Sequence, residues 1–326
     1  MELKDIYAAR RRIRGRVRET PLEHSPFLSE LCGGEVWLKL ENLQLTGSFK
    51  IRGALNKLLQ LSDEERRMGV VTASSGNHGQ GVGYVARELG VDATIVVPQN
   101  TPGVKREAIR RYGAELIVHG EECLEAERLA RKMGREMGKT FVSPYNDLDI
   151  IAGQGTVGLE MVEAASDLDV VLVPVGGGGL ISGVGCALKA VISGVEVLAV
   201  QSVASPVMYE SMRQGRIVEM ELEESVADGL HGGIEEGTIT FDLCCSLVDD
   251  FILVREETIK GAIRLLLTRQ RQVVEGAGAV GVAAIMEDPE RFQGRRVGVV
   301  VSGGNLDLEL LREIANSRES GSYKVF

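Results

Sequence analysis

Residues 170–188 read VVLVPVGGGGLISGVGCAL and carry no charged side chain. The stretch is almost long enough to span a bilayer, but Pro174 and six glycines, four of them consecutive, make a membrane helix costly. An apolar strand over 170–173, a glycine loop and a helix over 180–191 explain it better. Such a loop directs several backbone N–H groups toward one point, next to a helix N-terminus, and this is typical of a phosphate site.

Short apolar runs alternate with helix-like stretches along most of the chain. The runs lie at 70–73, 93–97, 115–118, 195–200, 251–254 and 297–301. This alternation predicts an α/β fold in which parallel sheets are covered by helices on both faces. At about 150 residues per domain, the chain suggests two domains, with ligands in the cleft between them. Residues 201–247 are polar and show no clear period, so we expect irregular structure there.

The composition excludes several classes of protein. Its 37 basic and 47 acidic residues give a net charge of −10, whereas a general nucleic-acid binder needs a basic surface. The cysteines show no CxxC or Cys/His spacing, which argues against a disulfide framework or a zinc site and indicates the cytoplasm. The arginine-rich N-terminus lacks the apolar segment of a secretory signal. Ile6, Ile13 and Val17 instead predict an amphipathic helix with a solvated arginine face.

Three further segments concentrate polar groups or glycine. Residues 73–81 read ASSGNHGQG between a strand and a helix, and their hydroxyl and N–H donors can hold a carboxylate. Residues 46–52 read TGSFKIR, and the apolar neighbours of Lys50 favour a neutral, nucleophilic amine. Residues 301–307 read VSGGNLD after the last strand, which places Ser302 at a carboxyl edge where α/β sheets bind ligands.

Together these segments fit one cofactor. Pyridoxal 5′-phosphate needs a lysine for its Schiff base, a phosphate cradle and a partner for its pyridine nitrogen. An enzyme that uses it on amino acids also needs a site for the substrate carboxylate. The four loops supply one candidate for each requirement.

The chain resembles the fold-type II pyridoxal-phosphate enzymes, and within them the threonine/serine dehydratases and serine racemases. The motifs that carry the resemblance are RETPL (18–22), GSFKIRGA (47–54), SSGNHGQG (74–81), IAGQGT (151–156), VGGGGL (175–180), ADGL (227–230), EGAGAVGVAA (275–284) and SGGN (302–305). The resemblance implies two open three-layer domains of the tryptophan synthase β-like fold, with the cofactor in the cleft between them. A large cofactor-binding domain would comprise 1–46 and 147–326, and a small substrate-side domain 47–146.

The resemblance also implies roles for individual residues. Lys50 matches the Schiff-base lysine, Asn77 the residue that binds the 3′-hydroxyl of the cofactor, and Ser302 the partner of the pyridine nitrogen. Glu275 matches a glutamate near the ring, and Gly229 matches a backbone contact. The phosphate loop would consist of Gly176, Gly177, Gly178, Gly179 and Leu180. The loop that receives the substrate carboxylate would consist of Ser74, Ser75, Gly76, Asn77 and His78.

The implied reaction is β-elimination of water from L-threonine or L-serine, which gives a 2-oxo acid and ammonia. Racemisation is an alternative, because Ser75 matches an acid/base serine on the ring face opposite the lysine in serine racemases. Dehydration of 3-hydroxyaspartate is another. It would need an added cation, for which Arg52 and His231 are weak candidates because such charges are usually solvated. A hypothesis of a different class is a non-catalytic phosphate- or nucleotide-binding module that uses the glycine loops alone, in which Lys50 is dispensable.

Departures from the family pattern carry further expectations. Relatives with a divalent-cation site have acidic side chains just after the strand that we expect to end at Val200, where this chain has Gln201 and Val207. Carboxylates suit hard cations better than an amide or a valine does, so we expect no divalent metal there. The chain ends about twenty residues after SGGN, so we expect no C-terminal regulatory region. The family pattern favours a homodimer or homotetramer.

Overall fold

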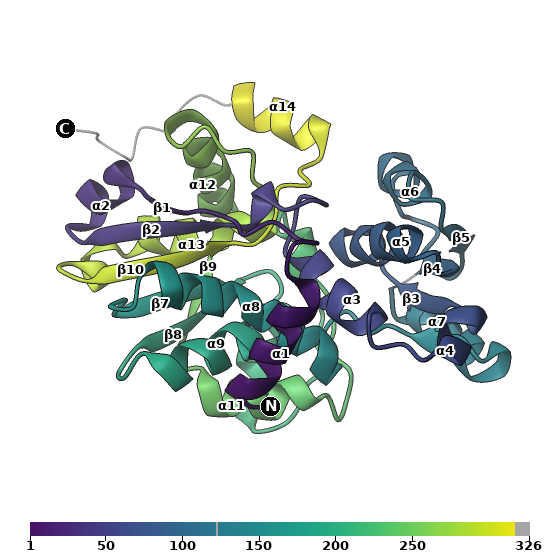
Figure 1. The fold of residues 1–326 in the computed structure, drawn as a ribbon. Helices are drawn as coiled ribbons and strands as arrows, with labels where there is room; N and C mark the ends of the chain where they lie inside the picture. The colour runs from purple at the N-terminus through teal and green to yellow at the C-terminus, as the bar shows by residue number, and fades with distance from the viewer. Residues whose placement is uncertain (122, 317–326) are drawn as a thin grey trace.

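The computed structural model describes residues 1–121 and 123–316. Within them the strands form two sheets (Figure 1). The larger sheet has the order β1 (Leu22–His24), β2 (Glu35–Leu40), β10 (Arg296–Val301), β7 (Val170–Pro174), β8 (Glu196–Ser202) and β9 (Asp250–Val254). All of its pairings are parallel except that of β1 with β2.

The smaller sheet is parallel throughout. Its order is β5 (Glu115–Val118), β4 (Ala93–Val97), β3 (Val70–Ala73) and β6 (Thr140–Phe141). The predicted α/β fold with parallel sheets is therefore confirmed. The domain limits at 46/47 and 146/147 stay a prediction, although the two sheets fall on either side of them.

Helices cover both faces of each sheet, as parallel sheets require. On the larger sheet, one face packs against α2 (Pro26–Cys32), α12 (Glu256–Arg269) and α13 (Gly276–Glu287), and the other against α8 (Leu148–Ala164), α9 (Gly179–Val191), α10 (Val207–Gln214) and α11 (Ile239–Leu247). On the smaller sheet, α3 (Lys50–Leu58) and α5 (Asn77–Leu89) cover one face and α7 (Cys123–Met137) the other. The remaining helices are α1 (Leu3–Ile13), α4 (Asp63–Met68), α6 (Gly103–Arg110) and α14 (Leu308–Asn316), with 3-10 turns η1 (Glu41–Leu43), η2 (Asp228–Leu230) and η3 (Pro289–Phe292).

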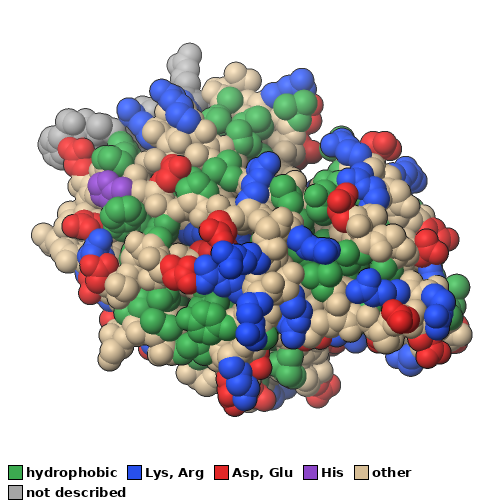
Figure 2. Space-filling model, viewed as in Figure 1, with side chains coloured by type: hydrophobic (Ala, Val, Ile, Leu, Met, Phe, Trp, Pro, Cys, Tyr) green, Lys and Arg blue, Asp and Glu red, His purple; other side chains and the backbone are tan. Residues whose placement is uncertain are grey.

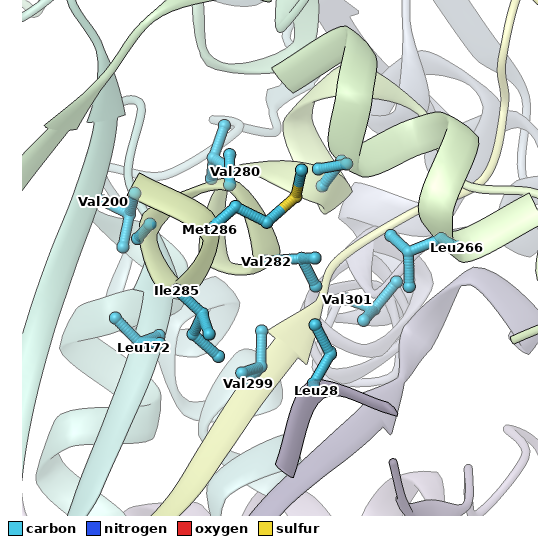
Figure 3. Close-up of a cluster of buried hydrophobic side chains, with 14 of the residues drawn as sticks. Leu28, Leu172, Val200, Leu266, Val280, Val282, Ile285, Met286, Val299 and Val301 are labelled. Atoms are coloured by element: carbon cyan, nitrogen blue, oxygen red, sulfur yellow. The ribbon is translucent and has the colours of Figure 1, made fainter. Parts of the chain in front are cut away.

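Helix α13 forms the centre of the larger core. Every residue from 276 to 286 is buried, which explains why this segment shows no amphipathic period. Figure 3 shows Val282 and Ile285 of this helix gathered with Leu172 and Val299 of the sheet. A Cβ on Gly281 would lie 2.7 Å from Val299 Cγ1, so glycine is needed for this close approach. Burying each branched side chain stabilises the fold by about 1.5–3 kcal/mol.

Helix α3 connects the two sheet layers. It packs against α5 on one side and α8 on the other. The Cβ that Gly153 of α8 lacks would lie 2.6 Å from the Cα of Gly53, so the backbones of α3 and α8 are in contact. Because Lys50 is the first residue of α3, this crossing determines where the lysine lies.

The predicted amphipathic helix at the N-terminus corresponds to α1. Ile6 and Ile13 are buried, whereas Val17 lies beyond the end of the helix. Most of the arginines from 10 to 18 are exposed, and Figure 2 shows Lys and Arg side chains gathered over this part of the surface. No helix of the described residues is long and apolar enough to cross a membrane.

The expectation of irregular structure over 201–247 was wrong in part, because α10, η2 and α11 lie there. The two α-helices are short and depend on tertiary contacts. Val207 and Met208 of α10 are buried, and the first N–H of α11, at Ile239, donates to Asn146 Oδ1 at 3.0 Å. Local periodicity in the sequence does not reveal such contacts.

Candidate active site

Lys50 lies where the chain enters α3 from a segment paired with the end of β10. Ser48 forms a bridge with Gly303, and the N–H of Phe49 donates to the carbonyl oxygen of Ser302. Lys50 Nζ donates to the carbonyl oxygen of Pro144 at 2.9 Å. Burial lowers the pKa of Lys50 to about 8, and the negative charge of Glu275 offsets part of that effect. The neutral fraction of the amine near neutral pH is therefore larger than that of a solvated lysine, which favours a nucleophile.

The predicted carboxylate loop follows β3 and opens α5. Ser74, Ser75, Gly76 and Asn77 are half-buried, and Ser74 Oγ accepts a hydrogen bond from the N–H of Gly76 at 3.3 Å. The first N–H groups of a helix have no partner within the helix and carry positive potential. The start of α5 is therefore suited to an anion.

His78 differs from the rest of this loop because its side chain is buried. Its Nε2 lies 3.1 Å from the carbonyl oxygen of Val142. A carbonyl only accepts, so Nε2 carries the proton and the buried Nδ1, which has no partner, is an acceptor. Burial and the nearby Lys50 lower the pKa of His78 to about 3. The neutral side chain has no second N–H for a carboxylate, so any such role of His78 falls to its backbone.

Asn77 and Glu275 meet across the cleft. Asn77 Nδ2 donates to Glu275 Oε1 at 2.6 Å, and Asn305 Nδ2 donates to Asn77 Oδ1 at 2.7 Å. Glu275 is 5% exposed, and burial raises its pKa to about 7, with a further contribution from Asp228. A carboxyl group with this pKa holds or releases a proton near neutral pH.

The four-glycine loop follows β7 and opens α9, as the sequence predicts. Gly178 is the N-cap and has a φ of +85°, which favours glycine. A Cβ on Gly177 would lie 2.4 Å from the Tyr145 ring, and one on Gly176 would lie 3.2 Å from the backbone of Leu230. These close approaches leave a bare backbone at a helix N-terminus, which suits a phosphate.

Ser302 and Gly229 lie beside the start of α13. Ser302 is buried directly after β10, and its Oγ donates to the carbonyl oxygen of Ala277 at 3.3 Å. A Cβ on Gly229 would lie 3.0 Å from the Cβ of Ala277. The structure thus brings Ser302, Gly229 and Glu275 to one helix end, next to the bridged segment that leads into α3 and Lys50.

Comparisons with known proteins agree with this geometry. A family model described as pyridoxal-phosphate dependent enzyme matches residues 13–303. The chain belongs to this family. It is 47% identical over 314 residues to the L-threonine ammonia-lyase of Thermotoga maritima, a match that covers 96% of this chain and 78% of that protein.

Solved structures of the family superpose closely on this chain. Maize serine racemase has a TM-score of 0.91 at 35% identity, and the match covers 96% of each chain. The T.th. threonine deaminase has a TM-score of 0.88 at 41% identity, over 94% of this chain and 99% of that one. The predicted fold type and cofactor are therefore confirmed, and the cofactor of this family member is pyridoxal phosphate.

The site residues fit that cofactor. The lysine amine, the glycine loop and the acceptor and donor groups at Asn77 and Ser302 supply what its aldehyde, phosphate and ring require. Among the described residues, Thr46 Oγ1, Ser48 Oγ and His78 Nδ1 are buried side-chain atoms without a partner, and they lie in the segments that surround Lys50. Buried polar atoms without a hydrogen-bond partner are consistent with a polar ligand that binds in the cleft.

Several contacts of the pyridoxal-phosphate site were missed by the sequence analysis. The ring of Tyr145 fills the space beside Gly177, and its hydroxyl accepts from the N–H of Glu235 at 3.0 Å. Asn305 lies within the quoted SGGN motif but received no role. Two ion pairs join helices α6 and α7, beside the smaller sheet, to the segment after β8. These pairs are Lys105–Asp228 and Arg131–Glu235. Residues so far apart in sequence give no local signal of their contact.

Two candidates for an added substrate cation do not supply one at this site. Arg52 is fully buried and paired with Glu41 and Glu160. His231 is exposed, and its Nε2 contacts the carbonyl oxygen of Glu223 at 3.1 Å. Arg52 is thus not free to meet a substrate, and the ring of His231 is engaged by a backbone carbonyl.

Gln201 uses its whole side-chain amide within the protein. Its Nε2 donates to the carbonyl oxygens of Val175 and Ser205, at 3.1 and 3.4 Å, and its Oε1 accepts from the N–H of Tyr209 at 2.9 Å. Among residues 1–121 and 123–316, no group of three or more His, Cys, Asp or Glu could hold a metal ion. The amide of Gln201 is thus engaged by backbone groups on both its nitrogen and its oxygen.

Proposed function

We propose that this pyridoxal-phosphate enzyme is an ammonia-lyase that eliminates water from L-threonine, with L-serine as a second substrate. The products are a 2-oxo acid and ammonia. The observation that carries the proposal is a half-buried lysine of lowered pKa, set between a glycine loop and a polar loop, in a chain 47% identical to an L-threonine ammonia-lyase. The bound cofactor would supply an electron sink for the charge that forms when the α-proton leaves.

Lys50 is the proposed attachment point of the cofactor and the base for the α-proton. Its lowered pKa leaves a larger part of the amine unprotonated than in a solvated lysine, and Nζ donates to the carbonyl oxygen of Pro144. Asn77 would bind the 3′-hydroxyl group of the cofactor ring, and Ser302 would be the partner of the ring nitrogen. Ser302 would be a neutral partner because its hydroxyl does not ionise near neutral pH. Its single hydrogen, which donates to the carbonyl oxygen of Ala277, would have to turn toward the ring nitrogen to donate there.

The proposed phosphate contacts are the N–H groups of Gly176, Gly177, Gly178, Gly179 and Leu180, with Gly229 as a further backbone contact. The substrate carboxylate would lie at the start of α5, on donors from Ser74, Ser75, Gly76 and Asn77 and on the backbone of His78. These groups orient the substrate without reading its side chain, which fits small hydroxy amino acids.

Racemisation is the second candidate activity. Maize serine racemase superposes with a TM-score of 0.91, and Ser75 is half-buried in the loop that would receive the carboxylate. A hydroxyl there would serve as acid/base on the face opposite Lys50. Chiral chromatography of unreacted serine and threonine tests this: formation of no opposite enantiomer would eliminate it.

Dehydration of 3-hydroxyaspartate is disfavoured because Arg52 is committed to the buried carboxylate of Glu41 and the partly buried carboxylate of Glu160. We further propose a cytoplasmic location and a homodimer or homotetramer. The acidic net charge gives no support for a nucleic-acid partner. The predicted division into a small domain over 47–146 and a large domain over the rest also belongs to this proposal.

The test is a panel of amino acids assayed for release of 2-oxo acid, with Lys50→Ala as the control. We expect L-threonine and L-serine to be turned over and the variant to be inactive. Full activity in Lys50→Ala would contradict the proposal, and so would turnover confined to substrates without a β-hydroxyl group.

A further inference from the structure

Asn305 touches three segments of the site at once. Its side-chain Nδ2 donates to the carbonyl oxygen of Thr46 at 2.9 Å and to Asn77 Oδ1 at 2.7 Å. Its backbone N–H lies near the carboxyl group of Glu275 and lowers the pKa of that group slightly. The residue lies in the exposed loop after β10, on the wall of a cavity of about 360 Å³ that Glu275 also lines.

The orientation of the Asn305 amide is determined by Thr46. A backbone carbonyl can only accept, so the NH₂ group of Asn305 must face it. A Cβ on Gly47 would lie 2.6 Å from Asn305 Oδ1, so the backbone approaches the other end of the amide closely. Asn305 therefore has a fixed donor end, and both hydrogens of that end are used.

That donor end in turn determines the orientation of Asn77. The oxygen of Asn77 must face Asn305, which leaves its NH₂ group facing Glu275 Oε1 at 2.6 Å. One N–H of Asn77 is used there and the second remains for a ligand. With the amide reversed, the oxygen of Asn77 would face the ligand, and a protonated Glu275 would become its donor. Glu275 thus accommodates both orientations, whereas Asn305 permits only one.

We propose that Asn305 is a positioning residue that keeps the amide of Asn77 turned so that an N–H, and not the oxygen, meets the ring oxygen of the cofactor. The proposal rests on the proposed function, which places Asn77 at that oxygen. Asn305 acts through Asn77 and does not itself touch the ring. Its side chain links the segment that carries Lys50 to the loop that carries Asn77.

The test uses the nearly isosteric change Asn305→Asp. A carboxylate cannot donate, so it forces the amide of Asn77 to reverse and to present its oxygen to the cofactor. Apoprotein is titrated with pyridoxal phosphate, and affinity and the pH titration of the visible absorbance are measured. We expect affinity to fall about tenfold and the absorbance titration to be displaced. Asn305→Ala releases the amide of Asn77 without reversing it. Its affinity for pyridoxal phosphate should lie between those of the wild type and Asn305→Asp.

A double-mutant cycle with Asn77→Ala separates positioning from a general effect of the new charge. In the Asn77→Ala background, Asn305→Asp should change affinity less than about twofold, because the group through which it acts is gone. Asn42→Ala is the matched control, since Asn42 also links two segments, through Gln272 and Val273. It should leave the absorbance titration unchanged.

Three results would overturn the inference. Asn305→Asp without effect in the wild-type background would do so, and so would an equal loss of affinity in both backgrounds. If wild-type apoprotein took up no pyridoxal phosphate at Lys50, the proposed function would fail, and this inference with it. If the wild type took up pyridoxal phosphate and Asn305→Asp bound it with unchanged affinity, only the inference about Asn305 would be refuted. Circular dichroism and thermal midpoints show whether each variant is folded.

Discussion

Arg52 binds Glu41 through two hydrogen bonds of 2.8 Å, from Nε to Oε2 and from Nη2 to Oε1, and neither side chain is exposed. Glu160 forms a second ion pair with the guanidinium of Arg52, and Lys39 forms an ion pair with Glu160. Two positive and two negative groups are thus balanced in the interior. Because Arg52 lies two residues after Lys50, the cluster holds the first turn of α3 against the larger sheet layer.

Replacing Arg52 by methionine should strongly destabilise the protein. The change leaves the carboxylates of Glu41 and Glu160 with only Lys39 as a cationic partner in the interior. Removing one partner of a buried ion pair costs about 3–5 kcal/mol. Denaturant unfolding measures the loss. The control is Arg10→Met, whose pair with Glu163 is partly exposed and should contribute less than about 1 kcal/mol. Equal losses in the two variants would contradict the assigned role.

Gly177→Ala should weaken cofactor binding because the new methyl group would lie 2.4 Å from the Tyr145 ring. The loop or the ring must move, and the backbone N–H groups then lose their common direction. We expect at least a tenfold loss of affinity for pyridoxal phosphate, equivalent to about 1.4 kcal/mol. Equilibrium dialysis measures it. Gly103→Ala, where a Cβ would meet nothing within 4 Å, is the control. Unchanged affinity in Gly177→Ala would show that the loop does not cradle the phosphate.

Glu275→Gln should change how the stability of the apoprotein depends on pH. Burial raises the pKa of Glu275 from 4.5 to about 7, so between these values the folded state holds a proton that the unfolded state lacks. Glu275 therefore makes the wild type lose stability as pH rises through this window, by up to about 3 kcal/mol. The glutamine variant should lack that loss, which denaturant unfolding at the two ends of the window measures.

Glu65→Gln provides the control for this prediction. The pKa of Glu65 is lowered, chiefly by the backbone N–H of Ser62, so its contribution is present above the unfolded pKa and is lost only as the solution becomes more acidic. It should leave the window above pH 4.5 unchanged. A pH dependence of Glu275→Gln identical to that of the wild type would contradict the raised pKa.

Removal of divalent cations should leave the protein unchanged. Gln201 has an amide in place of a carboxylate, and this amide donates to the carbonyl oxygens of Val175 and Ser205. We expect the thermal midpoint and the activity to be the same with a chelator and with added magnesium. Gln201→Glu should introduce a dependence on magnesium, because a carboxylate then joins two carbonyl oxygens. A fall in the wild-type midpoint on chelation would contradict this reading.

Features that depend on local chemistry could be predicted from the sequence. The glycine loop at 176–179 and the polar stretch at 74–78 both follow a strand and run into the first residues of a helix, as expected. Glycine and hydroxyl residues at such turns point to an anion whatever surrounds them. The apolar neighbours of Lys50 likewise indicated the burial that lowers its pKa.

Features that depend on distant contacts could not be predicted. Asn305 and Asn77 are 228 residues apart in the chain, and Arg52 and Glu160 are 108 apart. An arginine is usually solvated, so only its partners reveal that Arg52 is buried. Helix α13 lacked a period because it is buried on all sides, and α10 and α11 were missed because they depend on tertiary contacts.

The most direct measurement is borohydride reduction of the protein loaded with pyridoxal phosphate, followed by peptide mass mapping at a series of pH values. We predict a single label on Lys50, with a yield from apoprotein that rises around pH 8 as the amine loses its proton. Lys50→Arg should take up no label. A label on another lysine, or a yellow, ammonia-releasing Lys50→Arg protein, would contradict the assignment of the site.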